Sequence, residues 1–392
     1  MTRVPRITVV SSWFRKGGLD LLLAGMAGQT FDDWELILVD HRYVARHDRV
    51  KELAASLGIA NKVLHVPEHR CDWYWHSAAG YQTGYLLAEG EFVAHHIDWA
   101  FATPRWLEHH IAAHESAAQP RVVLGATRNR AIPPERVGLT PPPGTTREQA
   151  LTDIVTGEFV RGYQADRHSP VEGMFDELHG LDEPFQPTHL PRFRIQQWPH
   201  MDMKLHLDPQ PVDHTYFHAK NCSLPRRVLD DTWGIDETFD RGRGPWDNEL
   251  AFRYNAWGCE LWLEPKALIE APNPRWYLRT MPWGAMLDHP IPGRWSYQDG
   301  VDYQDRRYVE MRLGAEPKAN NAYDFQRRRG ELLAWKRGPR DLATWPGWGP
   351  EVETSRVALP KGPIAPLWPH ATWPTPAPPC LTRPDSEDPT RR

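Results

Sequence analysis

The sequence predicts an α/β protein in which a mixed, mainly parallel sheet carries helices on both faces. Over the first 125 residues, short β-branched runs alternate with amphipathic helical stretches, as in a parallel sheet with crossover helices. Polar and acidic residues directly follow several of these runs, at the edge where open α/β sheets bind ligands. Ordered patterns return between residues 215 and 263.

Each element is indicated by its local pattern. The run ITVV at 7–10 indicates a strand, and Leu21, Leu22 and Met26 share one face of a helix over 19–28. Further strands are expected at 35–39, 62–66, 91–95, 122–124, 215–224 and 260–263. Further helices are expected at 50–57, 81–88, 106–114, 226–231 and 247–256.

The remaining stretches are less regular. Residues 128–212 are rich in proline, histidine and charge, and we expect loops with short helices that cover a cleft. The pattern weakens from about residue 275, and ten prolines between residues 360 and 389 predict an extended or disordered tail.

Bulk composition excludes several classes. A formal net charge of −5 and 40% hydrophobic residues suit a globular protein and argue against a general polyanion binder. No apolar run reaches the roughly 18–20 residues of a membrane span, and no signal core follows the N-terminus. The cysteines are scattered without a C-x-x-C pair, which suits a reducing compartment. We therefore expect a cytoplasmic protein without a transmembrane segment.

Two charged groups are interpreted as ordinary surface. The stretch 306–340 is rich in arginine and lysine, which we interpret as a solvated helix face rather than a phosphate-binding patch. His109, His110 and His114 are interpreted as one face of the helix at 106–114.

The strand ends indicate where a ligand binds. Ser11-Ser12, Asp40 and the segment 95–98 each follow or end a predicted strand. Because the carboxyl ends of parallel strands lie at one edge, these residues converge on a predicted cleft.

Three longer stretches carry a family resemblance, in the right order. The first is ITVVSSWFRKGGLDLLLAGMAGQTFDDWELILVDHRY over 7–43, the second GYQTGYLLAEGEFVAHHIDWAFATPRWLEHH over 80–110, and the third NCSLPRRVLDDTWGIDETFDRGRGPWDNELAFRYNAWGCELWLEP over 221–265. Together they resemble the family 2 glycosyltransferases over roughly residues 5–270. The resemblance implies a Rossmann-like GT-A fold and an inverting transfer from a nucleoside-diphosphate sugar to a hydroxyl acceptor.

The resemblance also divides the chain. It implies a nucleotide-sugar-binding half at 1–125 and an acceptor-binding half at 126–272. An irregular C-terminal extension that packs on this core is expected at 273–359, and the proline-rich tail at 360–392.

Donor contacts are expected along the strand ends and the second matched segment. Asp40 falls where the family's aspartate recognises the nucleotide base. The full expected set is Ser11, Ser12, Trp13, Asp40, Gln82, His96 and Asp98.

The metal-binding turn of the family is incomplete. An ungapped match from Gly90 puts Ile97 and Trp99 on the two usual aspartates and leaves Asp98 between them. A divalent cation wants several oxygen ligands, so Asp98, with His95 or His96, leaves a Mn²⁺ or Mg²⁺ requirement open. Without a metal, we expect the departing diphosphate to be met by those histidines or by a cation among Arg15, Lys16, Arg275 and Arg279.

Asp247 matches the aspartate of the family's E-D-x-E-L motif at a helix start. An inverting transfer needs a base for the acceptor proton, and a carboxylate at a cleft suits that role. The family's preceding Glu is Trp246 here, which predicts a stacking contact. Acceptor contacts are expected from Asn221, Trp246 and Glu249, although Asn221 could instead fix the backbone and Glu249 could pair with Arg253.

Two other functions fit the sequence. One is a catalytically inactive GT-A domain that binds a sugar nucleotide or glycan, and the other is a sugar nucleotidyltransferase. The acceptor is open among a glycan, a lipid, a protein, a small molecule and a modified nucleobase, and the oligomeric state is open as well.

Overall fold

The computed structural model describes residues 4–13, 19–40, 43–69, 77–98, 100–130, 208–214, 217, 219–241, 246–272, 297–321 and 323–348. The expected loops at 128–212 lie mostly outside these residues. Arg15, Lys16, Arg275, Arg279 and the proline-rich tail at 360–392 lie wholly outside them.

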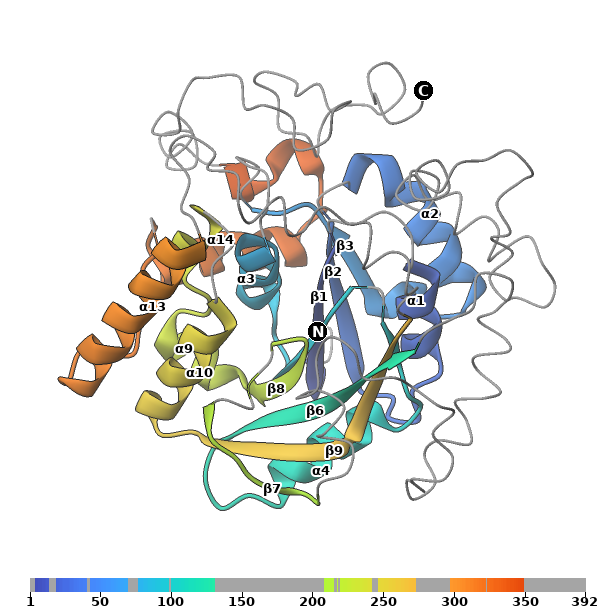
Figure 1. The fold of residues 1–392 in the computed structure, drawn as a ribbon. Coiled ribbons are helices and arrows are strands. Elements are labelled where there is room, and N and C mark those ends of the chain that lie inside the picture. The colour runs from blue at the N-terminus through green and yellow to red at the C-terminus, as the bar shows by residue number, and fades with distance from the viewer. Residues whose placement is uncertain are drawn as a thin grey trace, which may run out of the picture.

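The described strands form a nine-stranded sheet in the order β3-β2-β1-β4-β8-β6-β9-β5, with β7 paired to β9 (Figure 1). Their bounds are β1 Ile7–Trp13, β2 Trp34–Asp40, β3 Val63–Val66, β4 Phe92–His96, β5 Phe101–Ala102, β6 Arg121–Arg130, β7 Gln210–Pro211, β8 Asn221–Pro225 and β9 Glu260–Pro272. β3, β2, β1 and β4 run parallel, and β8 joins β4 antiparallel. The first strands therefore share one carboxyl edge.

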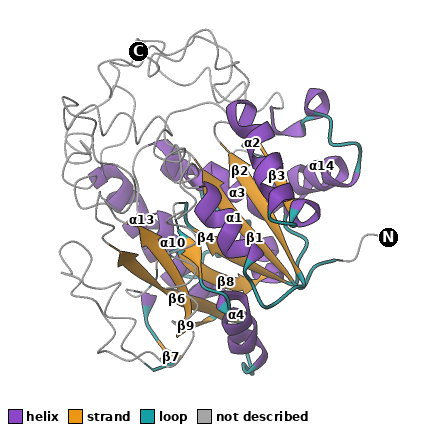
Figure 2. Cartoon of the chain, turned by 90° about the vertical axis from the view of Figure 1, so that its right-hand side faces the viewer, coloured by secondary structure: helices purple, strands orange, loops and turns teal. Residues whose placement is uncertain are grey.

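Helices cover both faces of this sheet (Figure 2). Their bounds are α1 Leu19–Ala27, α2 Tyr43–Ser56, α3 Ser77–Leu87, α4 Trp106–Glu115, α9 Arg226–Thr232, α10 Trp246–Trp257, α13 Tyr297–Arg312 and α14 Phe325–Arg337. Short 3₁₀ turns are η1 Ala60–Lys62, η7 Glu237–Arg241, η8 Leu342–Thr344 and η9 Pro346–Trp348. The expected mixed α/β architecture is confirmed.

Two hydrophobic cores lie on the two faces. One packs the sheet against α1, α2 and α4 and includes Val9, Leu38 and Trp106. The other packs it against α3, α9, α10 and α14 and includes Val10 and Tyr254. We call these the α4 face and the α10 face. Since alternate strand residues point to opposite sides, neighbouring residues of one strand contribute to different cores.

Tertiary contacts set element bounds that local patterns missed. α3 begins at Ser77, four residues before the predicted start, because Asp240 of η7 accepts hydrogen bonds from Ala78 N and Ala79 N at 3.2 and 2.8 Å. The carboxylate that caps the start of α3 is thus 161 residues away in sequence, so the residues next to Ser77 do not indicate where the helix begins.

β6 and β9 are longer than predicted because they stay paired on both sides of a shift in register. The parallel register moves from Gly125 opposite Glu264 to Ala126 opposite Leu268, so three residues of β9 have no partner there. Pro265 follows Glu264 and has no N–H to donate, which suits a bulge.

The interpretation of 306–340 as a solvated face is wrong for α14. Arg328, Arg329 and Lys336 are buried, with 1%, 7% and 6% of their surface exposed. Arg329 donates to the carbonyls of Tyr85 and Ala88 at the end of α3. The burial of this face does not follow from apolar spacing, because its inward side chains are cationic.

Among the described residues, none of the helices is both long enough and apolar enough to cross a membrane.

Candidate functional site

The carboxyl ends of three parallel strands meet side by side. Strand pairing puts Trp13 of β1 opposite Asp40 of β2, and Ser11 opposite His96 of β4. His96 in turn lies opposite Asn221, at the start of antiparallel β8. Paired residues point to the same side, so these five predicted site residues share the α4 face of one edge.

Consecutive histidines separate at this edge. The ring centroid of His96 lies 5.3 Å from that of Trp106 on α4. The ring centroid of His95 lies 3.4 Å from that of Tyr81 and 5.9 Å from that of Trp246, both on the α10 face. The two imidazoles therefore do not converge on one ion, which corrects the expectation that both could replace missing aspartates.

Burial also favours the neutral form of both histidines. It lowers the pKa of His96 to about 4 and that of His95 well below its usual range. Burial thus favours the neutral imidazoles, whereas a diphosphate bound nearby would favour their protonation, so their contact with a departing diphosphate stays a prediction. No hydrogen-bond partner reaches either ring nitrogen of His96 from the described residues.

Asp40 lies in an aromatic corner built by α2 and β3. It is fully buried, and its Oδ2 lies 3.1 Å from His65 Nε2. The rings of Tyr43 and His47 contact the His65 ring at 4.6 and 5.6 Å. Burial, with Asp48 and Asp40 adding to it, raises the pKa of Tyr43 to about 12, so its hydroxyl keeps its proton. Flat rings beside a carboxylate can contact a heteroaromatic base.

The serines at the end of β1 are tightly packed. Trp13 Nε1 donates to Ser11 Oγ at 2.8 Å, and Trp13 is wholly buried in the core of the α4 face. Ser12 faces α3, where a Cβ on Gly80 would overlap its hydroxyl. Gly80 is therefore required for α3 to approach the strand so closely.

Gln82 holds two segments together. Its Nε2 donates to Trp233 O at 2.9 Å and to the Tyr323 hydroxyl at 3.2 Å, and its Oε1 accepts from Ile235 N at 2.8 Å. The side chain is fully buried. These bonds fix the turn that precedes η7, so Gln82 has a structural role, and the donor contact expected of it stays a prediction.

Asp98 and His96 do not complete a metal site by themselves. Asp98 is buried in the turn after β4, two residues beyond His96. Among the described residues, no group of three or more His, Cys, Asp or Glu side chains could hold a metal ion. A Mn²⁺ or Mg²⁺ ion there would need further ligands.

Helix α10 begins at the same edge. The Trp246 ring lies 5.9 Å from the His95 ring and nearly parallel to it, at 12°, and it lies 5.9 Å from the Tyr81 ring. Asp247, the next residue, is partly exposed, and its Oδ1 accepts from Asn248 N at 3.1 Å. The Trp246 contacts thereby hold the first turn of α10, with Asp247, next to the end of β4.

Glu249 is held by an ion pair. It is fully buried, and its Oε2 lies 2.6 Å from Arg253 Nη2. Burial raises the pKa of Glu249, and the neighbouring Arg253 opposes that shift. The structure thus contains the expected ion pair, and the acceptor contact expected of Glu249 stays a prediction.

Asn221 likewise fixes the backbone. Its Nδ2 donates to Ala126 O and Ala267 O, each at 2.7 Å, where the β6–β9 register shifts. Its Oδ1 accepts from Trp106 Nε1 at 2.8 Å. The buried amide of Asn221 therefore fixes the backbone at this edge, as the alternative interpretation had it, and the acceptor contact stays a prediction.

Sequence reasoning missed residues that link this edge to the rest of the chain. The Tyr303 and Tyr323 hydroxyls donate to Asp236 and Glu237, both at 2.7 Å. His69 Nε2 lies 2.9 Å from Glu237 Oε1. The adjacent acids Asp236 and Glu237 could have indicated these contacts, since buried carboxylates require hydrogen-bond donors.

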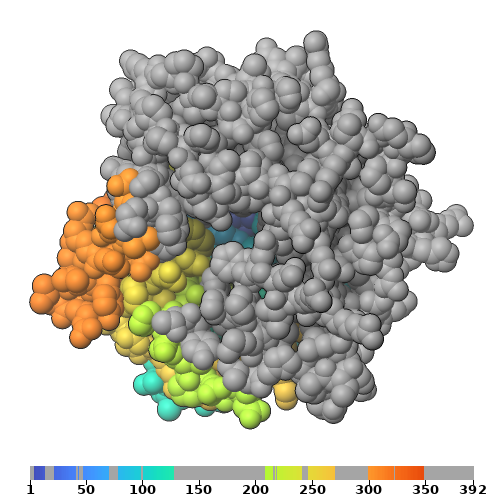
Figure 3. Space-filling view, in the orientation of Figure 1, coloured from blue at the N-terminus to red at the C-terminus, as the bar shows by residue number. Residues whose placement is uncertain are grey.

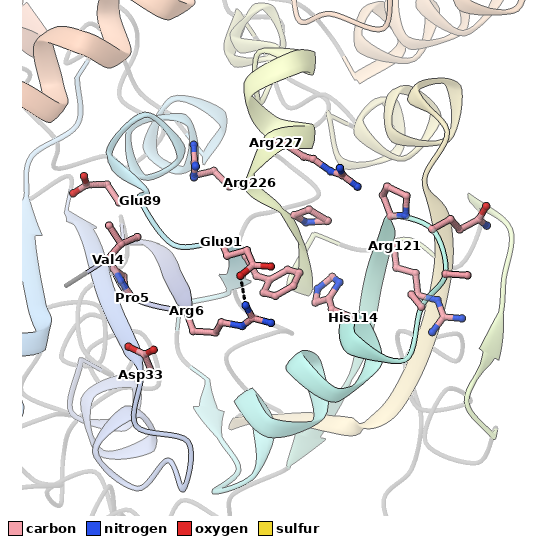
Figure 4. A pocket seen from close by; sticks show the side chains of 16 residues that line it. Val4, Pro5, Arg6, Asp33, Glu89, Glu91, His114, Arg121, Arg226 and Arg227 are labelled. Carbon is pink, nitrogen blue, oxygen red and sulfur yellow. Dashed lines mark hydrogen bonds and ion pairs between the residues drawn. The ribbon is translucent and has the colours of Figure 1, made fainter.

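A cavity of about 730 Å³ opens at the opposite edge of the sheet (Figure 4). Arg6 precedes β1 there, and Arg121 begins β6. Arg6 pairs with Glu91, and Arg121 pairs with Glu260, so these charges are engaged within the protein. Ser11, Trp13, Asp40 and His96 instead lie at the carboxyl edge of the sheet.

Comparisons with known proteins give distant structural similarity. No protein-family model matches the chain, and no curated protein does. The chain is similar to S. aureus TarS 1–349 in complex with UDP at 12% identity and a TM-score of 0.41, covering 84% of this chain and 70% of that one. It is also similar to the mannosyltransferase PcManGT from Pyrobaculum calidifontis in complex with GDP-Man and Mn²⁺, at 12% identity and a TM-score of 0.41, covering 91% and 84%.

Proposed function

We propose that the chain transfers a sugar from a nucleoside-diphosphate sugar to a hydroxyl group with inversion, and that Asp247 is the base. The placement of α10 carries the proposal. Trp246 contacts His95 on the α10 face at the end of β4, so α10, with Asp247 in its first turn, begins near the carboxyl ends of the parallel strands. The sequence resemblance of the segment around Asp247 supports the same role.

The reaction is a single displacement. The acceptor oxygen attacks the anomeric carbon while the bond from that carbon to the diphosphate oxygen breaks. The acceptor proton passes to the Asp247 carboxylate, and the departing nucleoside diphosphate keeps the bonding electrons. Asp247 lies in the first turn of α10, where backbone N–H groups without a partner in the helix can hydrogen-bond a carboxylate.

Donor recognition is assigned to the corner around Asp40. The fully buried carboxylate and the Tyr43, His47 and His65 rings provide a charged acceptor and flat contact surfaces. A nucleobase offers ring N–H donors and two aromatic faces, so it matches this corner better than a sugar or a lipid does.

A panel of sugar nucleotides tests the proposal. UDP-glucose, UDP-N-acetylglucosamine and GDP-mannose would each be added in a thermal-shift assay, followed by measurement of nucleoside diphosphate release. We expect at least one compound to raise the melting temperature and to be hydrolysed slowly, with water as acceptor. No shift and no release with any of them would contradict the proposal.

The same assay separates the alternatives. Stabilisation without release of diphosphate would favour an inactive binding domain, and pyrophosphate-dependent formation of a nucleoside triphosphate would favour a nucleotidyltransferase. Repeating the assay with Mn²⁺ and with a chelator tests Asp98. Loss of binding in chelator would assign the Asp98 carboxylate to a metal, and unchanged binding would leave it as a direct contact.

A further inference from the structure

Helix α13 lies beside the helix that begins with the proposed base. α13 packs against α10, and both reach the surface in the view of Figure 3, α13 in orange and α10 in yellow. Two side chains of α13, Tyr303 and Arg307, reach inward to buried acids of the acceptor-side segment. We call these two residues the α13 clamp.

Tyr303 provides the first contact. Its hydroxyl donates to Asp236 Oδ2 at 2.7 Å, and Asp236 is fully buried. Its ring lies edge-on to Phe239 at 5.1 Å. Burial and the neighbouring Asp236 raise the pKa of Tyr303 to about 12, so the hydroxyl remains a donor at neutral pH.

Arg307 provides the second contact, to α10 itself. Its Nε lies 3.8 Å from Glu249 Oε1, while Arg253 binds the same carboxylate from within α10. Arg253 also donates to Thr232 O at 3.0 Å and to Gly234 O. The segment around Gly234 and the first turns of α10 are therefore joined through Glu249, and α13 holds that junction from outside.

The position of Glu249 connects the α13 clamp to the direction of the Asp247 side chain. Glu249 lies two residues after Asp247, within the first turns of α10. A contact that fixes Glu249 fixes the rotation of this helix, and with it the direction of the Asp247 carboxylate. Misplacing a catalytic group by about 1 Å can lower the rate by roughly 10²-fold.

We propose that Tyr303 and Arg307 are positioning residues for the transfer and hold Asp247 toward the acceptor hydroxyl. This inference rests on the proposed function, because it assumes that Asp247 is the base. It gives the segment beyond residue 296 a part in turnover rather than in folding alone.

Tyr303→Phe tests the hydroxyl while keeping the ring on Phe239. We expect kcat for hydrolysis of the best sugar nucleotide to fall about tenfold or more, with the donor Kd from calorimetry unchanged. Arg312→Gln is the matched control, because Arg312 is exposed on the same helix and contacts Tyr308 rather than either clamp residue, and it should keep the wild-type kcat.

Substitutions of Arg307 test the clamp independently, so the test remains possible if Tyr303→Phe does not fold. Arg307→Gln should lower kcat, and Arg307→Lys, which keeps a positive charge near Glu249, should recover part of it. An unchanged kcat in Tyr303→Phe and Arg307→Gln would overturn the clamp, as would a parallel loss of kcat and donor binding. A wild-type protein that binds and hydrolyses no sugar nucleotide would instead refute the proposed function.

Discussion

Asn221 joins three parts of the sheet edge through one amide. It donates to backbone carbonyls of β6 and β9 where their register shifts, and it accepts from Trp106 of α4. His110 Nε2 lies 3.1 Å from the same Oδ1 atom. Because Oδ1 is an acceptor, His110 donates through Nε2. Ser223 Oγ lies 2.8 Å from His110 Nδ1, which accepts in that tautomer.

Asn221→Ala should therefore destabilise the protein. It would leave the Ala126 and Ala267 carbonyls and the Trp106 indole N–H buried without a partner, and each such group costs about 1–3 kcal/mol. We expect the free energy of unfolding in urea to fall by about 3 kcal/mol or more. Asn255→Ala, at an exposed position of α10, is the control and should stay within about 0.5 kcal/mol. A small effect at both positions would show that the amide does not hold the edge.

At the scale of elements, α14 caps α3. Arg329 donates to Tyr85 O, Leu86 O and Ala88 O at 2.9, 3.2 and 2.8 Å, and Lys336 donates to Leu87 O at 3.0 Å. The last carbonyls of a helix have no partner within it and carry partial negative charge. Two buried cations supply both the donors and the charge, and Asp240 provides an acceptor at the other end of α3.

Removing the guanidinium tests this cap. Arg329→Met keeps most of the aliphatic stem but leaves three carbonyls buried, so we expect the free energy of unfolding to fall by about 2–4 kcal/mol. Arg327→Met on the same helix should change it by less than about 1 kcal/mol, since that side chain is 51% exposed and pairs with Glu331 at the surface. Equal effects of the two variants would contradict a capping role.

At the scale of the whole molecule, buried histidines link folding to pH. Burial lowers the pKa of His110 to about 3 and that of His96 to about 4, and it places the pKa of His114 well below the usual range. In the unfolded chain a histidine takes up a proton near pH 6.5. Between about pH 6.5 and pH 4, the unfolded chain therefore binds more protons than the folded protein.

The free energy of unfolding should consequently fall as the pH is lowered through this window, by about 1.4 kcal/mol per pH unit for each such histidine. Urea unfolding at pH 7 and at pH 5 measures the change. His110→Gln should remove one histidine's share of it. A wild-type difference that His110→Gln leaves intact would contradict the linkage.

Most strands of the central sheet could be predicted from the sequence, because each is a short β-branched run that is recognisable from its own residues. The strand ends at Ser11, Asp40 and His96 followed from the same reasoning, and strand pairing brings them together. The opposite directions of His95 and His96 also follow from strand alternation, once both belong to β4.

The remainder depended on contacts between distant segments. α14 turns cationic side chains inward, and those charges become tolerable only beside the carbonyls of α3 and the carboxylate of Glu35. Gln82 and Asn221 carry side chains that suit ligand binding, yet both amides are used by backbone groups more than 90 residues away. Residue type predicts that such groups find partners, but the fold decides which partners.

The central claim is that Asp247 is the base. Measuring the turnover of Asp247→Asn tests it most directly. The substitution keeps the size of the side chain and removes its ability to take a proton, as does the control Asp231→Asn at an exposed position of α9. Hydrolysis of the best sugar nucleotide and its Kd would be measured for both variants. We predict a loss of roughly 10²–10⁴-fold in kcat for Asp247→Asn alone, with the donor Kd unchanged. Wild-type turnover in Asp247→Asn would contradict the claim.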